Sequence, residues 1–224
     1  MKIVALLPMK GNSERVPNKN LKSFCGKPLY HRVLNTLLAC TSIDKVLINT
    51  DSDRIKADVS NTYGAERVVL VDRPVELQGD FVSMNKIIDY DITQEEADFY
   101  LQTHSTNPLL KTETVDAAIK KMLAHKEEAD SIFSVTKLQT RLYDEHGNPV
   151  NHNPQKLIRT QDLPALYEEN SNFFIFTRNS FRDAGSKRIG MNPMMYEIDK
   201  IEAMDIDEPA EFLIAEAAFK MLRL

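Results

Sequence analysis

Hydrophobic residues along this chain alternate between short continuous runs and helical spacing. The run over residues 2–7 is apolar almost throughout, which is typical of a strand covered on both faces. Similar short runs predict further strands over residues 45–49, 67–71, 99–103, 130–135, 173–177 and 201–204. Between these runs, apolar residues return every three to four positions, which indicates helices between the strands.

The first helical pattern follows residue 28. An amphipathic helix is predicted there, because five apolar residues fall at i, i+3, i+4, i+7 and i+8. These are Tyr30, Val33, Leu34, Leu37 and Leu38. Comparable spacing predicts helices over residues 55–63, 81–88, 115–123 and 212–222. The alternation indicates an α/β fold of three layers, in which helices cover both faces of a mostly parallel sheet.

The pattern loosens over residues 143–194. Turn-forming residues stand at Gly147 and Pro149 and again at Asn192 and Pro193. We therefore expect one domain over residues 1–224, from which this segment departs as an excursion that carries a hairpin. No internal repeat or low-complexity linker divides the sequence.

Composition and charge exclude several classes of protein. Of the 224 residues, 42% are hydrophobic, so the chain can bury enough apolar surface to offset its ordering entropy, and disorder is excluded. No apolar run reaches the roughly 18–20 residues that cross a bilayer. The net charge of −5 disfavours nucleic acid as a partner, and two cysteines are too few for a disulfide framework. We expect a cytoplasmic protein without a membrane or nucleic-acid partner.

The loop after the first predicted strand is the first place to look for a ligand site. Ligands of open α/β sheets bind outside the carboxyl ends of the strands. The loop matches neither common phosphate-binding motif, but it carries three cations, Lys10, Arg15 and Lys19. Its hydrogen-bonding residues are Asn12, Ser13 and Asn20. Such a group suits a triphosphate, and the alternative is a solvated basic turn.

A pair of carboxylates precedes the last predicted helix. Asp205 and Asp207 stand at i and i+2, which would point both side chains to the same side of an extended segment. Hard Mg²⁺ prefers such oxygen ligands. The alternative role for Asp207 is to cap the helix that starts near Pro209.

The loop resembles the signature of the acylneuraminate cytidylyltransferases, also called CMP-sialic acid synthetases. That signature runs Pro-Ala-Arg-Gly-Gly-Ser-Lys-x-Ile-Pro-x-Lys-Asn, and the matching residues here are Pro8, Gly11, Ser13, Pro17, Lys19 and Asn20. The resemblance implies a Rossmann-like nucleotidyltransferase fold and a loop that wraps the phosphates of CTP. Gly11, Asn12, Ser13 and Asn20 would then contact the nucleotide.

Two residues of the loop depart from the signature. Lys10 replaces the usual Arg, which removes a bidentate fork, and Glu14 replaces the usual Lys, which inverts a charge. Arg15 also occurs in the related Kdo cytidylyltransferase loop and would compensate. By resemblance, the phosphates are held by Lys10, Arg15 and Lys19.

Further segments resemble the same family in the same order. Arg73 opens an Arg-Pro-x-x-Leu-x-x-Asp element whose Arg helps to hold the cytidine in relatives. His104 stands where the family has a Gln that lines the sugar side of the pocket. The alternative roles are a surface charge for Arg73 and a polar turn around His104.

Two later segments imply contacts with the sugar. Residues 159–164 resemble Arg-Arg-Gln-Asp-Leu-Pro, so Arg159 would bind the sugar carboxylate, with Gln161 beside it. Asn172 stands where relatives present an Asn to the sugar, and its neighbours are bulkier than in the family pattern.

The resemblance also supports the metal site and implies the reaction. The family has Asp-Ile-Asp at residues 205–207, followed by acidic residues that Glu211 and Glu216 match. The implied reaction joins a sialic or related nonulosonic acid to CTP, with Mg²⁺, and gives a CMP-sugar and pyrophosphate. Relatives are homodimers whose excursion reaches the partner's site. A Kdo-type cytidylyltransferase, a GT-A-type glycosyltransferase and an inactive nucleotide-binding homologue remain the alternatives.

Overall fold

A computed structural model describes residues 1–222 of the chain, and its centre is a seven-stranded sheet. The strands are β1 (Ile3–Leu6), β4 (Lys45–Thr50), β5 (Val68–Asp72), β6 (Phe99–Thr103), β7 (Ser131–Leu138), β8 (Leu166–Phe176) and β9 (Pro193–Glu197). Their order across the sheet is β5-β4-β1-β6-β8-β7-β9. β8 pairs antiparallel with both of its neighbours, whereas the other pairs are parallel. The expectation of a mostly parallel sheet is therefore confirmed.

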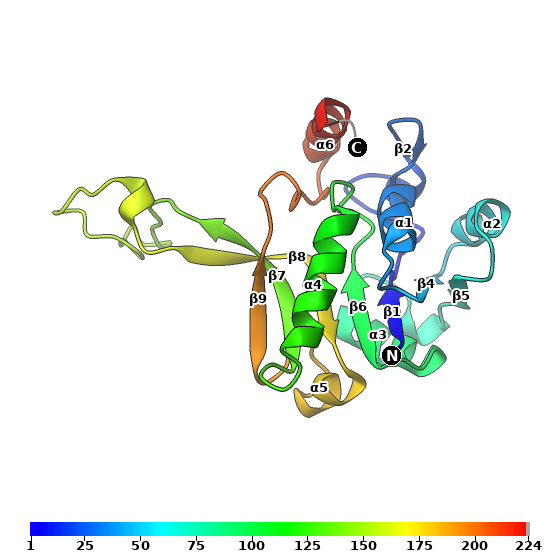
Figure 1. Ribbon diagram of the computed structural model, residues 1–224. Helices are drawn as coiled ribbons and strands as arrows, with labels where there is room; N and C mark the ends of the chain where they lie inside the picture. Colours follow the sequence, from blue (N-terminus) through cyan, green and yellow to red (C-terminus); the bar gives the residue numbers. More distant parts are fainter. Residues whose placement is uncertain (223–224) are drawn as a thin grey trace.

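Helices cover both faces of this sheet (Figure 1). They are α1 (Leu29–Ala39), α2 (Asp53–Thr62), α3 (Met84–Gln94), α4 (Thr112–Ala124), α5 (Arg178–Asp183) and α6 (Pro209–Leu222). Successive residues of β1 point to opposite faces. Ile3 and Ala5 pack in one apolar cluster with α1, α2 and α4, and Val4 and Leu6 pack in another with α3 and α5. The α/β fold of three layers is therefore confirmed.

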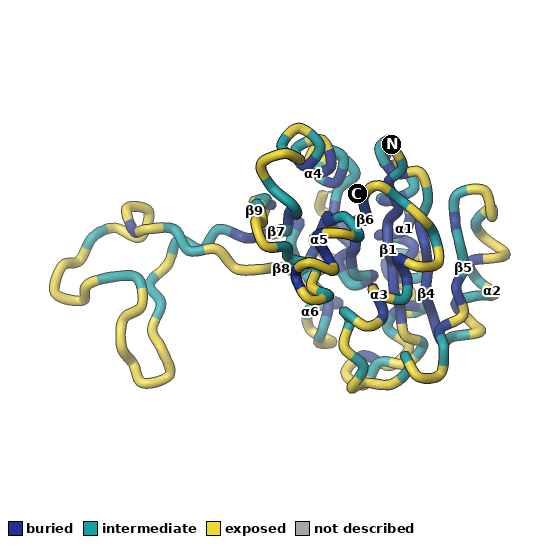
Figure 2. Tube along the Cα trace, turned by 90° about the horizontal axis from the view of Figure 1, so that it is seen from below, coloured by how far each residue is buried: buried dark blue, intermediate teal, exposed yellow. Residues whose placement is uncertain are grey.

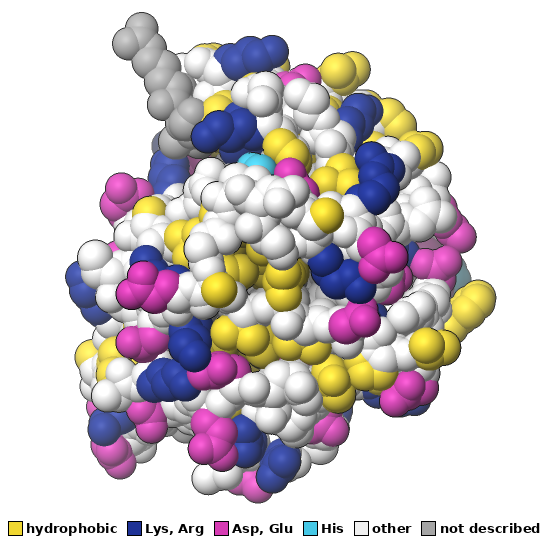
Figure 3. Space-filling view, turned by 90° about the vertical axis from the view of Figure 1, so that its right-hand side faces the viewer, with side chains coloured by type: hydrophobic (Ala, Val, Ile, Leu, Met, Phe, Trp, Pro, Cys, Tyr) yellow, Lys and Arg dark blue, Asp and Glu magenta, His cyan; other side chains and the backbone are white. Residues whose placement is uncertain are grey.

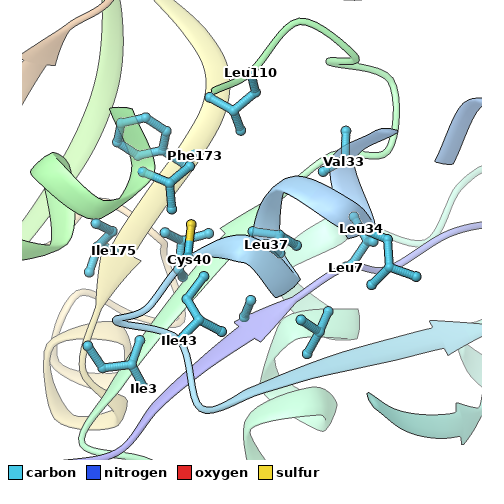
Figure 4. Packing of buried hydrophobic residues seen from close by; sticks show 14 of the residues in the cluster. Ile3, Leu7, Val33, Leu34, Leu37, Cys40, Ile43, Leu110, Phe173 and Ile175 are labelled. Carbon is cyan, nitrogen blue, oxygen red and sulfur yellow. The ribbon is translucent and has the colours of Figure 1, made fainter. Parts of the chain in front are cut away.

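The larger cluster joins α1 to the sheet. Val33, Leu34 and Leu37 of α1 are buried in it together with Leu7, and Cys40 lies beside Leu37 and Ile43 (Figure 4). Burial raises the pKa of the Cys40 thiol to about 12, so this cysteine behaves as a small apolar residue. Among residues 1–222, no helix is both long and apolar enough to cross a membrane.

A third apolar cluster lies at the carboxyl ends of the strands. It joins α6 to the short hairpin of β2 (Ser23–Phe24) and β3 (Lys27–Pro28) and to the loop after β1. Val16 of that loop and Ile206, which precedes α6, are both fully buried in it. Two segments that are far apart in the sequence are thereby held side by side.

The segment between β7 and β8 forms an arm that stands away from the sheet (Figures 1 and 2). Residues 139–165 are mostly exposed and contain one short 3₁₀ helix, Thr160–Asp162. The rest of the expected excursion over residues 143–194 is not part of the arm, because β8 and β9 belong to the central sheet. The excursion is therefore shorter than predicted and begins slightly earlier.

Residues 201–203 belong to a turn, and the strand that the sequence pattern predicted over residues 201–204 does not form. The carboxylate of Asp199 accepts from the backbone N–H of Ile201 at 2.8 Å, and the Asp199 carbonyl accepts from Ala203 at the same distance. Such a side-chain bond favours a turn over an extended segment. The strand at the sheet edge is β9 instead, which the pattern did not reveal.

The face that carries α2 and β5 has charges of both signs (Figure 3). Acidic and basic side chains are interspersed there, and hydrophobic side chains gather across its middle. This face therefore has no field of a single sign.

Candidate active site

A cleft of about 590 Å³ opens at the carboxyl ends of the strands. It extends across the sheet from the segment after β5, past the loop after β1, to β6 and β8. The predicted site residues that line it are Lys10, Ser13, Arg15, Lys19, Asn20, Arg73, His104, Asp205 and Asp207. This position is the one that ligands occupy in open α/β sheets.

Cations of the loop meet the acidic segment before α6. Lys19 Nζ donates to the carbonyl oxygen of Ile206 at 2.6 Å and lies 3.3 Å from Asp207 Oδ1. Arg15 Nη2 lies 3.0 Å from the same carboxylate oxygen, and Arg15 Nη1 lies 3.1 Å from Glu208 Oε1. The predicted triphosphate loop and the predicted metal pair are thus in direct contact.

The acidic segment is held in place by its own hydrogen bonds. Glu211 Oε2 accepts from the backbone N–H groups of Asp207 and Glu208 at 2.6 and 2.8 Å, as a carboxylate at a helix N-terminus does. Glu211 therefore caps α6, which leaves the Asp207 carboxylate free of that task. Burial raises the pKa of the Asp205 carboxyl, and the neighbouring charge of Asp207 raises it further.

Close packing and hydrogen bonds fix the loop itself. A Cβ on Gly11 would lie 2.8 Å from Ser52 Cβ, so only glycine fits there, and its N–H donates to Asp51 Oδ1 at 2.6 Å. Asn20 is buried, donates to the carbonyl of Lys10 at 2.9 Å and accepts from Ser105 Oγ at 2.7 Å. Both ends of the Asn20 side chain are engaged within the protein.

Gly11 and Asn12 belong to this loop but do not line the cleft. The side chain of Asn12 accepts from the N–H of Ser13 at 3.0 Å. At the mouth of the cleft, Lys10 Nζ lies 2.5 Å from Asp80 Oδ1. Glu14, the residue that inverts the charge of the family pattern, also lines the cleft.

Arg73 is buried at the β5 end of the cleft. Its Nε donates to Asn49 Oδ1 at 2.8 Å, and its Nη2 donates to the carbonyls of Asn49 and Met9 at 2.9 and 3.1 Å. Asn49 Nδ2 donates in turn to Asp91 Oδ1 at 2.5 Å. Desolvation lowers the pKa of Arg73 and raises that of Asp91 to about 7. A buried chain of three polar side chains therefore orients this guanidinium.

His104 lies at the opposite end, beside an arginine that the sequence reasoning missed. Arg188 Nη1 donates to Gln102 Oε1 at 2.8 Å and lies 3.4 Å from His104 Nε2. Burial lowers the pKa of His104 to about 4, and the charge of Arg188 adds to this. His104 is therefore neutral at pH 7. In the sequence, Arg188 lies in a segment without a clear helix or strand pattern. Such a segment is a weak indication of a functional residue.

Three predicted sugar contacts lie outside the cleft. Arg159 and Gln161 are on the exposed arm, where Arg159 Nε lies 2.7 Å from Asp162 Oδ2 and the Gln161 carbonyl accepts from Gln139 at 2.6 Å. Asn172 is fully buried and donates to the carbonyl of Ala203 at 3.0 Å. Within this chain, the structure therefore does not bring these three residues to the cleft.

The Asp91 carboxyl should make stability depend on pH. Its pKa is raised in the folded state, so the folded protein binds a proton that the unfolded chain releases near pH 4. The free energy of unfolding should therefore fall as pH rises from about 4 to about 7. We expect Asp91→Asn to remove this part of the fall, as measured by urea unfolding across that range. Parallel curves for the two proteins would contradict the assignment.

Residues 4–219 match the family model described as Cytidylyltransferase. The CMP-N,N'-diacetyllegionaminic acid synthase of Legionella pneumophila is 27% identical, over 99% of this chain and 97% of that protein. N-acylneuraminate cytidylyltransferase A of Danio rerio is also 27% identical, over 96% of this chain and 50% of that protein.

A solved structure gives the same result for the fold. It is a CMP:2-keto-3-deoxy-manno-octonic acid synthetase complexed with CTP, and it superimposes with a TM-score of 0.72 at 14% identity, covering 100% of both chains. The nucleotidyltransferase fold expected from the sequence is therefore confirmed. Because the family model spans nearly the whole sequence, this chain belongs to the cytidylyltransferase family.

Proposed function

We propose that this protein transfers CMP from CTP to a 2-keto sugar acid of the nonulosonic class and releases pyrophosphate. The observation that carries the proposal is the contact of the cationic loop with the Asp205–Asp207 segment inside the cleft. Two relatives whose names specify such sugars align over almost the whole chain, which supports this substrate class.

The order of strands supports a matching order of subsites. Arg73 lies beyond β5, the cationic loop follows β1, and His104 follows β6, so the three lie in sequence across the sheet. We place the cytosine nucleoside at the Arg73 end, the phosphates at the loop and the sugar near His104. In-line displacement further requires that the sugar hydroxyl approach the α-phosphorus from the side opposite the departing pyrophosphate.

The loop cations would stabilise the negative charge that builds on the pyrophosphate. Lys10, Arg15 and Lys19 line the cleft on one side, and each is held by an acidic partner before the nucleotide arrives. Cations that are positioned in advance cost little reorganisation when charge develops. Their acidic partners include Asp207, so the site also has oxygen ligands to offer a cation that accompanies CTP.

Asp205 and Asp207 fit a magnesium ion by their chemistry. Both line the cleft, and the pKa of the desolvated Asp205 carboxyl is raised, as expected of a buried carboxylate that gains from an added cation. Among residues 1–222, no group of three or more metal-binding side chains occurs. Two carboxylates suffice for Mg²⁺ when phosphate oxygens and water complete its coordination. When bound, the ion would neutralise phosphate charge and ease deprotonation of the sugar hydroxyl.

We further propose that the protein is a homodimer and that the arm of one protomer enters the cleft of its partner. Arg159 and Gln161 lie on the arm, outside the cleft of their own chain, and Arg159 pairs with Asp162 there. The arm also exposes Tyr143, Val150 and Leu157. Exposed apolar side chains on an extended segment are expected to be covered in an assembly.

Asp207→Asn should lower kcat by about 100-fold or more, which is the order of the loss when one preorganised charge is removed. The chain should still fold, because Asp207 is half exposed and the cap of α6 comes from Glu211. Pyrophosphate release is measured with CTP, Mg²⁺ and a panel of nonulosonic acids and Kdo. Asp183→Asn, on an exposed position of α5, is the matched control and should retain activity.

Unchanged turnover in Asp207→Asn would contradict the metal assignment. If the wild-type protein releases no pyrophosphate with any of the acids, the proposed function is contradicted. Consumption of a sugar nucleotide without pyrophosphate release would favour a glycosyltransferase instead.

Mixing two inactive variants tests whether the arm acts in the partner's cleft. Arg159→Gln and Asp207→Asn should each be nearly inactive alone. A mixed dimer contains one cleft with an intact Asp207 and an arm with an intact Arg159 from the other protomer. After subunit exchange, about a quarter of wild-type activity should return, since half of the dimers are mixed and each has one good site. If mixing restores nothing, the arm serves its own protomer or does not serve the site.

A further inference from the structure

Arg188 is a partly buried cation in the wall of the cleft, between α5 and β9. Its guanidinium carbon lies 4.0 Å from the centroid of the Phe174 ring, and Nη1 donates to Gln102 Oε1. Phe174 belongs to β8 and Gln102 to β6, so two strands of the sheet fix the guanidinium. The side chain is therefore positioned before any ligand binds.

The charge of Arg188 is not balanced in the way that the loop cations are balanced. Lys10, Arg15 and Lys19 each have a carboxylate within 4.0 Å. For Arg188, no such ion pair is found within residues 1–222. Desolvation lowers the pKa of Arg188, and the charge of Glu169 raises it in part. A guanidinium still keeps its charge at neutral pH.

The hydrogen bonds of Arg188 also leave most of its donors unused. A guanidinium has five N–H donors, and Arg188 uses one of them on Gln102 and approaches His104 with the same nitrogen. Arg73, which is buried at the other end of the cleft, has three oxygen acceptors within the protein. Removing a charge from water without pairing it is costly, so an anionic ligand would offset this cost at Arg188.

We propose that Arg188 binds the carboxylate of the acceptor sugar and so selects sugar acids over neutral sugars. This rests on the proposed function, because it assumes that the acceptor occupies the β6 and β8 end of the cleft. Arg188 lines that end together with His104 and Ser171, whereas Arg73 lies beyond β5. A planar guanidinium pairs with a carboxylate through two parallel hydrogen bonds, which fixes the orientation of the sugar as well as its charge.

Three residues that line this end of the cleft with Arg188, namely His104, Ser171 and Thr106, add no charge of their own. His104 is neutral at pH 7, because burial lowers its pKa to about 4. Ser171 offers a hydroxyl and Thr106 another, and neither carries charge. Arg159, for which the sequence predicted this role, lies on the arm and is paired with Asp162. An arm from a partner would therefore add to Arg188 and not replace it.

Substitution of Arg188 tests the proposal through two separate Michaelis constants. With the nonulosonic acid that the wild-type protein turns over best, Arg188→Gln should raise KM for the acid by about 10- to 100-fold, which is the loss of a charge-assisted hydrogen bond. KM for CTP should change less than about twofold, because Arg188 lies at the other end of the cleft from Arg73. Arg188→Lys should give an intermediate KM for the acid, since it keeps the charge and loses the fork.

Lys187→Gln is the matched control. Lys187 is exposed, is next in the chain to Arg188 and does not line the cleft, so the same loss of charge there should leave both constants unchanged. The methyl ester of the acid is compared with the free acid. The wild-type protein should strongly prefer the free acid, and Arg188→Gln should lose most of that preference, which a merely structural role would not cause.

Binding separates this proposal from the proposed function. Isothermal titration of N-acetylneuraminate into protein saturated with CDP measures the acid site without turnover. Binding that needs Arg188, without pyrophosphate release in any assay, would overturn the function and support the anion site. Turnover with an unchanged KM for the acid in Arg188→Gln, or an equal rise in both constants, would overturn the role of Arg188. Neither binding nor turnover in the wild-type protein would overturn both.

Discussion

The site depends on one contact, that of the loop after β1 with the segment before α6. Lys19 reaches both the Ile206 carbonyl and the Asp207 carboxylate, and Arg15 reaches Asp207 and Glu208. Half-exposed ion pairs contribute little stability by themselves. What holds the two segments together is the burial of Val16 and Ile206 in a shared apolar cluster. The apolar residues supply the free energy, and the charged residues beside them are presented to the cleft.

The charges of the cleft are arranged so that a ligand of mixed charge fits it. The loop cations are paired with Asp80, Asp207 and Glu208, and a triphosphate with a divalent cation brings both signs at once. When such a ligand binds, its phosphates would pair with the cations of the loop, and the carboxylates would bind the metal ion. Lys10 and Glu14, the two residues that depart from the family pattern, both line this cleft, and Lys10 pairs there with Asp80.

Much of the fold could be predicted, because the apolar patterns of strands and helices are local. The failures occur where a side chain determines the local structure. Asp199 turns residues 201–203 away from the predicted strand. The sequence left two roles open for Asp207, and the cap of α6 comes from Glu211 instead. The loop could be predicted because it follows the first strand, and Arg73 and His104 because their segments resemble the family pattern. All of them line one cleft because the strands before them end at the same edge of the sheet. Arg188 could not be predicted, since its place depends on contacts with Gln102 and Phe174, which are distant in sequence.

The central claim is that the loop and the Asp205–Asp207 segment bind one ligand, CTP with its metal ion. Isothermal titration of CTP at increasing Mg²⁺ concentration tests it most directly, with the wild-type protein and with Asp205→Asn. We predict that Mg²⁺ tightens CTP binding to the wild-type protein and that this gain is lost in the variant, while CTP binding without Mg²⁺ is retained. The same Mg²⁺ dependence in both proteins would contradict the account.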